Sequence, residues 1–232
     1  MEMPTTGGRP GRARHRGVPL AFACLGSMLL GGCSVGVPDS SVPAATSNTP
    51  VLATPTITPG YDAAAVAARD LPFAAGGTLA PGVPVGISDE LKSAPGWKLE
   101  KENVAGSSQY ARTDGCVVAA RVSTGQAPLA RGGDRDSTVA LFQYLDGTIQ
   151  PSYLKTETLQ WGGTLDAPGK NVEVLALEQA AAPGGRSTAV LARVFGTADS
   201  SAYISVSCPD AAALASARND VRRYLPLLPP GA

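Results

Sequence analysis

The chain has 232 residues, with 19 basic and 19 acidic residues and a formal net charge of zero at pH 7. Proteins that bind nucleic acids carry basic patches and a high isoelectric point, so this balance gives no reason to expect a nucleic-acid partner. The only histidine is His15. A part of the chain that lacks His15 cannot form a Ser-His-Asp or Cys-His catalytic site, and it cannot form a zinc site that contains histidine.

The start of the chain has the pattern of an export signal. Four arginines and one acid, Glu2, fall within the first 17 residues, and the run from Val18 to Leu30 has no charge. A membrane-spanning helix needs about 20 apolar residues, so this run is too short to be one. Its length fits the apolar core of a signal peptide. We therefore expect residues 1–32 to be a signal peptide.

The predicted cleavage site contains Leu30, Gly31, Gly32 and Cys33 in succession. This motif resembles the lipobox of bacterial lipoproteins, which consists of an aliphatic residue, two small residues and a cysteine. The resemblance implies cleavage before Cys33, attachment of a diacylglycerol to its thiol, and an anchor on the extracytoplasmic side of the cell membrane. Each acyl CH₂ buried in the bilayer contributes about 0.8 kcal/mol, so two or three chains hold a protein stably. The alternative is an ordinary signal peptide in which Cys33 has no role.

Processing at this position would change the chemistry available to the chain. It would remove His15, four of the 19 basic residues and one of the 19 acidic residues, which leaves a net charge of about −3. We therefore expect no metal site and no cofactor. With Cys24 removed and Cys33 lipidated, Cys116 and Cys208 remain, and thiols of exported domains usually pair. We predict a disulfide between them.

Composition divides the rest of the chain into three parts. Residues 33–60 are rich in Ser, Thr, Pro, Ala and Val, with Asp39 as the only charge, which predicts a disordered, extended tether. Its composition resembles the glycosylated stalks of actinobacterial lipoproteins, and a bare spacer is the alternative. Residues 61–86 predict a short helix at Tyr61–Asp70 and then a Gly/Pro-rich linker. The globular domain is expected at residues 87–228.

Hydrophobic periodicity predicts an α+β domain. Alternating residues predict strands at 97–102, 116–122, 156–161, 172–179, 188–196 and 202–208, the last two joined as a hairpin. Helices are predicted at Asp136–Leu145, capped by Asp136 and Ser137, and at Pro209–Leu225, where Pro209 takes the first helical position. The natural architecture is an antiparallel sheet packed by helices, with Cys116 and Cys208 meeting in the core.

The order of these features resembles the LpqN-type lipoproteins of mycobacteria. The shared features are the lipobox, the Thr/Pro-rich tether, a strand that opens with Pro95-Gly96-Trp97-Lys98, and the helices at Asp136–Leu145 and Pro209–Leu225. Those proteins resemble the PsbP fold, so the resemblance implies an α/β/α sandwich. It also implies a role in cell-envelope or lipid-related binding, without an agreed active site.

Three polar motifs have both a catalytic or binding interpretation and a structural one. Ser152 and Lys155 match the S-x-x-K pattern of serine β-lactamases, but the companion motifs are absent and a polar loop is the alternative. Glu100 and Glu102 could form a carboxylate pair or a calcium site, or lie on a solvated surface. Arg218, Arg222 and Arg223 could bind an acidic headgroup or a cell-wall phosphate. The alternative is that they only stabilise their helix, because positive charges interact favourably with its negative C-terminal end.

Four aromatic residues are candidates for a ligand pocket. Phe142, Tyr144, Tyr153 and Trp161 could line an apolar space between helix and sheet, as in most small-molecule sites, or each could pack in the core.

The leading hypothesis is a non-catalytic module, anchored on the outer face of the cell membrane, that binds a lipid, a cell-wall component or an envelope protein. The alternatives are a serine hydrolase that uses Ser152 and Lys155, and a purely structural envelope assembly factor.

Overall fold

The computed structural model describes residues 61–231, so the predicted signal peptide, Cys33 and the tether lie outside the described residues. The strands are β1 (Gly86–Ile87), β2 (Trp97–Val104), β3 (Ser107–Arg112), β4 (Val117–Thr124), β5 (Lys155–Gly163), β6 (Pro168–Gln179), β7 (Ser187–Phe195), β8 (Ser200–Cys208) and β9 (Leu227–Leu228). The α-helices are α1 (Ala63–Ala67), α2 (Asp134–Leu145) and α3 (Ala211–Tyr224). Short 3-10 helices are η1 (Phe73–Thr78), η2 (Glu90–Ser93), η3 (Ala127–Leu129) and η4 (Pro151–Tyr153).

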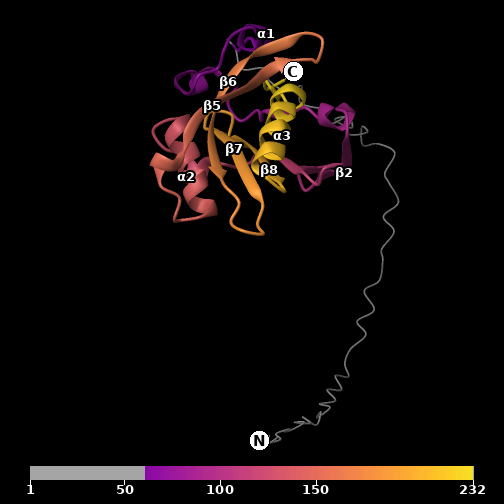
Figure 1. Cartoon of the computed structure of the whole chain (residues 1–232). Coiled ribbons are helices and arrows are strands. Elements are labelled where there is room, and N and C mark those ends of the chain that lie inside the picture. Colours follow the sequence, from indigo (N-terminus) through magenta and orange to yellow (C-terminus); the bar gives the residue numbers. More distant parts are fainter. Residues whose placement is uncertain (1–60, 232) are drawn as a thin grey trace, which may run out of the picture. The chain divides into compact units, whose positions relative to one another are not determined.

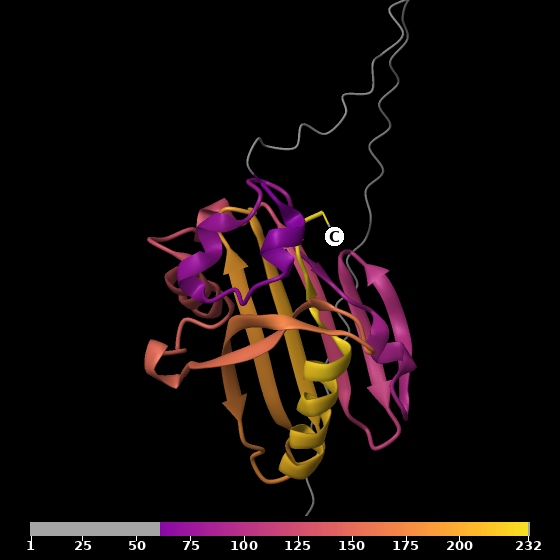
Figure 2. The same ribbon diagram turned by 90° about the horizontal axis from the view of Figure 1, so that it is seen from above.

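Within the described residues, the strands form one nine-stranded sheet in the order β1-β9-β5-β6-β7-β8-β4-β3-β2. Neighbouring strands are antiparallel except β5 and β9, which form a parallel pair. The sheet curls into a half-barrel, and in Figures 1 and 2 the β5–β6 hairpin crosses β7 and β8 at a steep angle. β6 pairs with β7 only from Leu175 to Gln179, and its first half pairs with β5 alone and forms a bridge to Leu71.

Helix α3 packs on the inner face of the half-barrel. Its apolar stripe, Leu214, Ala217, Val221 and Leu225, is at most 2% exposed, as the helical spacing predicted. These side chains meet the inward-facing residues of the strands in the larger hydrophobic core. Burial of each such Leu or Val side chain contributes about 1.5–3 kcal/mol.

Helix α2 packs on the opposite, outer face. Leu141 and Phe142 contact Leu175, Ala192 and Val194 of β6 and β7 in a second, smaller core. An antiparallel sheet with a helix on each face confirms the predicted α+β class. The sheet is a curled half-barrel (Figures 1 and 2), and the narrower expectation of a PsbP-like sandwich stays a prediction.

The folded part of the chain begins earlier than the sequence indicated. We expected a linker up to Gly86, but Val66, Leu71, Leu79 and Val85 are at most 3% exposed and belong to the larger core. This segment packs across one end of the curled sheet (Figure 2), where the Val66 carbonyl accepts a hydrogen bond from Trp161 Nε1 at 3.2 Å. Its few large apolar residues are irregularly spaced among Ala, Gly and Pro, so they show no helix or strand period.

Both main helices start at a different residue from the one predicted. Helix α2 starts at Asp134 after Gly133, so Asp136 lies in the first turn instead of at the cap. Helix α3 starts at Ala211, and Asp210 is its N-cap, accepting a hydrogen bond from the backbone N–H of Ala213 at 2.8 Å. Pro209 therefore precedes the cap and is not the first helical residue.

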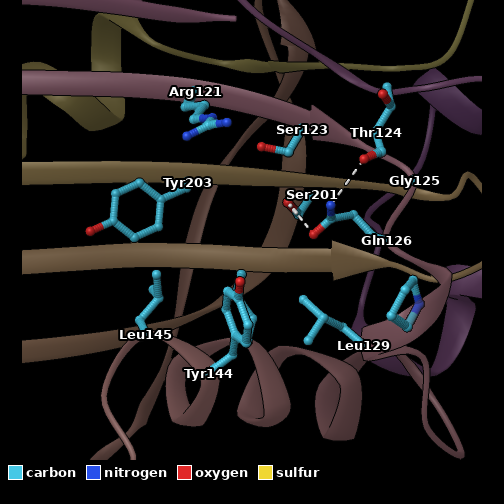
Figure 3. Close-up of a pocket in the computed structure, with 12 residues that line it drawn as sticks. Arg121, Ser123, Thr124, Gly125, Gln126, Leu129, Tyr144, Leu145, Ser201 and Tyr203 are labelled. Carbon is cyan, nitrogen blue, oxygen red and sulfur yellow. Dashed lines mark hydrogen bonds between the residues drawn. The ribbon is translucent and has the colours of Figure 1, made fainter. Parts of the chain in front are cut away.

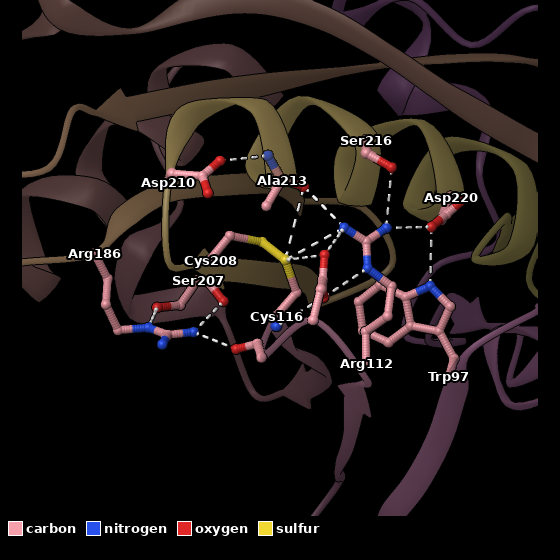
Figure 4. Close-up of a disulfide and its surroundings, with 12 residues drawn as sticks. Trp97, Arg112, Cys116, Arg186, Ser207, Cys208, Asp210, Ala213, Ser216 and Asp220 are labelled. Carbon is pink, nitrogen blue, oxygen red and sulfur yellow. Dashed lines mark hydrogen bonds and ion pairs between the residues drawn. A yellow bond between two sulfur atoms is a disulfide. The ribbon is translucent and has the colours of Figure 1, made fainter.

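The disulfide between Cys116 and Cys208 is present (Figure 4). Val117 of β4 pairs with Ser207 of β8, which places the two cysteines opposite each other at the end of this ladder. Both are fully buried on the inner face beside α3, as the face assignment predicted. The cysteines are separated by 92 residues, and closing a loop of that size stabilises the fold by about 4–5 kcal/mol in the chain-entropy model.

Arg112 joins the disulfide region to α3 (Figure 4). Its guanidinium binds both oxygens of Asp114, at 3.0 and 2.7 Å, and Asp220 of α3 at 2.8 Å. It also lies over the Trp97 ring, 5.2 Å from the centroid, and Trp97 Nε1 donates to the same Asp220 at 2.9 Å. The Arg112 hydrogen bond holds the pKa of the Asp114 carboxyl below its ordinary value. The β2–β3 edge of the sheet is thereby held against α3.

A buried ion pair lies where β6 separates from β7. Arg193 of β7 is 0% exposed and donates from Nε and Nη2 to Asp134 Oδ2 of α2, at 3.1 and 2.8 Å. Its remaining N–H groups bind the carbonyls of Leu71 at 2.8 Å, Glu173 at 3.1 Å and Pro72 at 3.2 Å. Burial lowers the pKa of the Arg193 guanidinium, and the Asp134 charge opposes that shift. Four separate segments of the chain thus meet at one side chain.

The surroundings of this pair complete the junction. The guanidinium lies between the rings of Phe73 and Phe195, 4.7 and 4.9 Å from their centroids. Asp134 Oδ1 accepts a hydrogen bond from the Gly196 N–H at 2.9 Å. One turn along α2, Thr138 Oγ1 accepts a hydrogen bond from the Val194 N–H at 2.9 Å. Helix α2 is therefore attached to β7 by buried polar contacts as well as by apolar packing.

Two adjacent glycines provide a test of this junction. A Cβ atom at Gly76 would lie 2.1 Å from Asp134 Oδ2, whereas a Cβ at Gly77 would meet nothing within 4 Å. We expect Gly76→Ala to displace the Asp134 carboxylate and lower the free energy of unfolding by about 1–3 kcal/mol or more. Gly77→Ala should change it by less than about 0.5 kcal/mol. Urea denaturation followed by circular dichroism measures both, and equal effects would contradict the role given to Asp134.

Candidate functional site

A cleft of about 640 Å³ lies on the outer face beside α2 (Figure 3). Helix α2 packs over β6 and β7 and leaves the outer face of β8 and β4 open at this place. We call this space the α2 cleft. It is lined by Arg121, Ser123, Thr124, Gly125, Gln126, Pro128, Leu129, Leu141, Tyr144, Leu145, Ser201 and Tyr203.

One wall of the α2 cleft is apolar. It consists of Leu141, Tyr144 and Leu145 of α2 together with Pro128 and Leu129 of η3. Tyr144 is 78% exposed and Leu145 is 52% exposed. Both side chains lie across the α2 cleft from the outer face of β8 and β4 (Figure 3). Large apolar groups gathered at a hollow often mark a binding surface.

The facing wall is polar and comes from the sheet. Successive strand residues point to opposite faces, so Ala202 and Ile204 of β8 point into the core while Ser201 and Tyr203 point into the α2 cleft. Arg121 and Ser123 of β4 lie directly beside Tyr203 and Ser201 in the ladder. Burial raises the pKa of the Tyr203 phenol, which therefore stays protonated at neutral pH and can both donate and accept hydrogen bonds.

Hydrogen bonds hold the polar end of the α2 cleft in place. Gln126 Nε2 donates to the Thr124 carbonyl at 3.0 Å, and Ser201 Oγ donates to Gln126 Oε1 at 3.1 Å (Figure 3). The backbone N–H of Ala127 donates to Asp199 Oδ1 at 2.8 Å, which ties the loop to the β7–β8 turn. These groups are therefore positioned before any ligand arrives, which lowers the entropy lost on binding.

Arg121 supplies the charge of the α2 cleft. No other lining residue is ionised at neutral pH, and among the described residues no carboxylate forms an ion pair with Arg121. The α2 cleft thus combines one cation with several hydroxyl and amide groups and an apolar wall. Such a lining can bind an uncharged or anionic amphipathic molecule, and its described residues include neither a carboxylate nor a histidine to act as a general base.

The structure does not bring the four predicted pocket aromatics together. Only Tyr144 lines the α2 cleft. Phe142 and Trp161 are 1% and 0% exposed, in the outer and inner cores respectively, and Trp161 stacks on Phe195 with ring centroids 6.1 Å apart. Tyr153 is 54% exposed on η4. These aromatic residues thus lie on the inner face of the sheet, on its outer face and at the surface. Helices and strands have different residue periods, so their side chains point in different directions.

The other candidate motifs lie on exposed parts of the fold. Ser152 lies in η4 and Lys155 opens β5, so they do not share the α-helix on which the S-x-x-K pattern works. Glu100 and Glu102 lie on exposed positions of β2. In the part of the chain that the structure describes, no three His, Cys, Asp or Glu residues are grouped so that they could hold a metal ion.

The predicted arginine cluster of α3 is divided between two roles. Arg218 binds both oxygens of Glu157 on β5, at 2.5 and 2.6 Å, and Arg222 binds the same carboxylate at 2.8 Å. Arg218 also pairs with Glu178. Burial by itself would raise the pKa of Glu157, but the two arginines outweigh it and the net pKa is lowered. Arg223 instead lies over the ring of Tyr224. Arg218 and Arg222 therefore join α3 to β5.

The sequence matches no protein-family model and has no significant match among curated proteins. Between residues 61 and 231, no helix is long and apolar enough to cross a membrane.

Sequence reasoning did not identify most of the α2 cleft lining. Arg121, Gln126, Ser201 and Tyr203 were not proposed as site residues. A signal was available on β8, where Ser201, Tyr203, Ser205 and Ser207 alternate with apolar residues. That pattern indicates a polar outer face, but it does not show that α2 leaves this face uncovered.

The ion pairs of Glu157 predict a pH dependence of stability. The pKa of Glu157 is lower in the folded state than in the unfolded state, where it is about 4.3. The ion pairs therefore add to the free energy of unfolding above that pH, and this stabilisation is lost as the pH falls through the pKa of the folded state. We expect Glu157→Gln to be less stable at pH 7 and to lose less stability than the wild type between about pH 5 and pH 3. Urea titrations at each pH measure this.

Glu100→Gln is the matched control, since it makes the same charge change at an exposed strand position. It should keep the wild-type pH dependence. An unchanged slope in Glu157→Gln would show that the arginines do not stabilise this carboxylate.

Proposed function

We propose that the protein is a non-catalytic binding module of the bacterial cell envelope and that the α2 cleft is its ligand site. The observation that carries this proposal is the paired lining, in which an exposed apolar wall on α2 faces a polar wall on β4 and β8. Ligand sites typically have volumes of about 300–1,000 Å³ and mostly apolar walls with a few placed polar groups. The α2 cleft, at about 640 Å³, falls within that range.

The proposed location rests on the sequence. The uncharged run after an arginine-rich start and the resemblance of Leu30–Cys33 to a lipobox support export and a lipid anchor on Cys33. The disulfide between Cys116 and Cys208 fits an oxidising compartment outside the cytoplasm. The cell membrane is then a partner through the lipid, and the folded part is available to a lipid, cell-wall or protein ligand.

A relationship to the LpqN-type, PsbP-like proteins is a separate proposal. The order of elements and the presence of a helix on each face of an antiparallel sheet are compatible with it. We therefore propose binding from the α2 cleft itself and not from that resemblance.

Native mass spectrometry of the chain purified from its own host tests the proposed site. We expect a non-covalent ligand on the wild type and its loss in Ser123→Trp, because an indole on β4 would fill the α2 cleft. Ser152→Trp, at an exposed position outside the α2 cleft, is the matched control and should keep the ligand. An empty wild type, or a ligand retained equally by Ser123→Trp, would overturn the proposal and favour a purely structural assembly role.

A further inference from the structure

The two walls of the α2 cleft differ across its width. The apolar side chains of α2 and η3 face Arg121, Ser123, Ser201 and Tyr203 of the sheet (Figure 3). A bound molecule therefore meets carbon atoms on one side and hydrogen-bonding groups on the other. We propose that this ligand is a glycan that carries an acidic group, either a carboxylate or a phosphate. The inference rests on the proposed function of the α2 cleft as a ligand site.

A sugar ring fits this lining because it has the same two-sided character. A pyranose presents C–H groups on a face and hydroxyl groups around its edge. Its C–H face can pack on the α2 wall while its hydroxyl groups reach Ser123, Ser201 and Gln126. An acyl chain has no polar side, so it would leave the Arg121 guanidinium and the Ser123 hydroxyl against hydrocarbon, which is unfavourable for a polar group without a partner.

Two tyrosines strengthen this assignment. Tyr144 presents an exposed ring from α2, and Tyr203 presents its ring from the facing strand (Figure 3). A tyrosine offers a large flat surface at a low entropy cost because only two torsions must be fixed, and it ends in a hydrogen-bonding hydroxyl. These properties suit the flat C–H face and hydroxylated edge of a sugar.

Arg121 accounts for the acidic group. It lies along β4 from Ser123, on the side away from Gln126, so the positive charge is near one end of the polar wall (Figure 3). A guanidinium binds a carboxylate or a phosphate through two parallel hydrogen bonds. No described carboxylate forms an ion pair with it. The expected ligand therefore places an acidic group at this end of the α2 cleft and hydroxyl groups along the rest of the polar wall (Figure 3).

Isothermal titration calorimetry of the full chain with three probes tests this inference. The probes are tetragalacturonate as an acidic glycan, chitotetraose as a neutral glycan, and dodecyl phosphate below its micelle concentration as an acidic alkyl chain. We expect tetragalacturonate to bind most tightly. Arg121→Gln should weaken it about tenfold or more, because a charge-assisted contact is lost, and should leave the binding of chitotetraose unchanged.

Tyr144→Ala should weaken both sugars, because the ring serves the C–H face of either. Arg135→Gln and Tyr153→Ala remove the same types of side chain at exposed positions outside the α2 cleft and should keep wild-type affinities. Thermal unfolding of each variant shows whether the fold is retained.

The outcomes separate the two proposals. Tighter binding of dodecyl phosphate than of either sugar, abolished by Ser123→Trp, would overturn the glycan inference and leave the α2 cleft as a ligand site. If no sugar bound while Ser123→Trp still removed the native ligand, the glycan inference alone would be wrong. If Ser123→Trp still bound the native ligand, the proposed function of the α2 cleft would itself be wrong.

Discussion

The buried Arg193–Asp134 pair is the interaction on which the arrangement of this fold depends. Removing a guanidinium and a carboxylate from water costs several kcal/mol for each ion, so a pair of this kind persists only when every hydrogen-bonding group is satisfied. Here all five N–H groups of Arg193 have acceptors, two of them to Asp134 and three to backbone carbonyls. The fixed planar geometry of the guanidinium therefore sets how η1, β6 and α2 lie against β7.

The α2 cleft follows from this constraint. Asp134 and Thr138 hold the first turns of α2 over β7, and the helix continues from there in a set direction. Its last turn places Tyr144 and Leu145 along the α2 cleft, opposite β8 and β4 (Figure 3). The outer faces of β8 and β4 remain open, and their outward-pointing polar residues become the second wall. On this account the site exists because a buried ion pair positions α2 over β6 and β7, which leaves the outer faces of β8 and β4 uncovered.

Local patterns in the sequence predicted the features that depend on neighbouring residues. The stripe of Leu214, Ala217, Val221 and Leu225 predicted the buried face of α3. The alternation from Ala202 to Cys208 predicted the inner face of β8, and the two cysteines left after processing predicted the disulfide. Features that depend on distant segments were missed. Arg193 lies within a predicted strand, but its partner Asp134 is 59 residues away, and two of its three carbonyl acceptors, Leu71 and Pro72, belong to a segment whose composition predicts a linker. The α2 cleft likewise combines four segments of the chain. The hydrophobic periodicity within each segment does not show that they lie close together.

Hydrogen exchange of the Asp134→Asn variant tests the central claim most directly. The substitution keeps the shape of the side chain but removes the charge that pairs with Arg193. If the ion pair positions α2, amide protection should fall at least tenfold in α2 and at Val194 and Gly196, whose N–H groups donate to Thr138 and Asp134. The amides of α3 and the β4–β8 ladder should lose much less. Unchanged protection in α2, or an equal loss throughout residues 61–231, would contradict the claim that this pair fixes the helix and the cleft beside it.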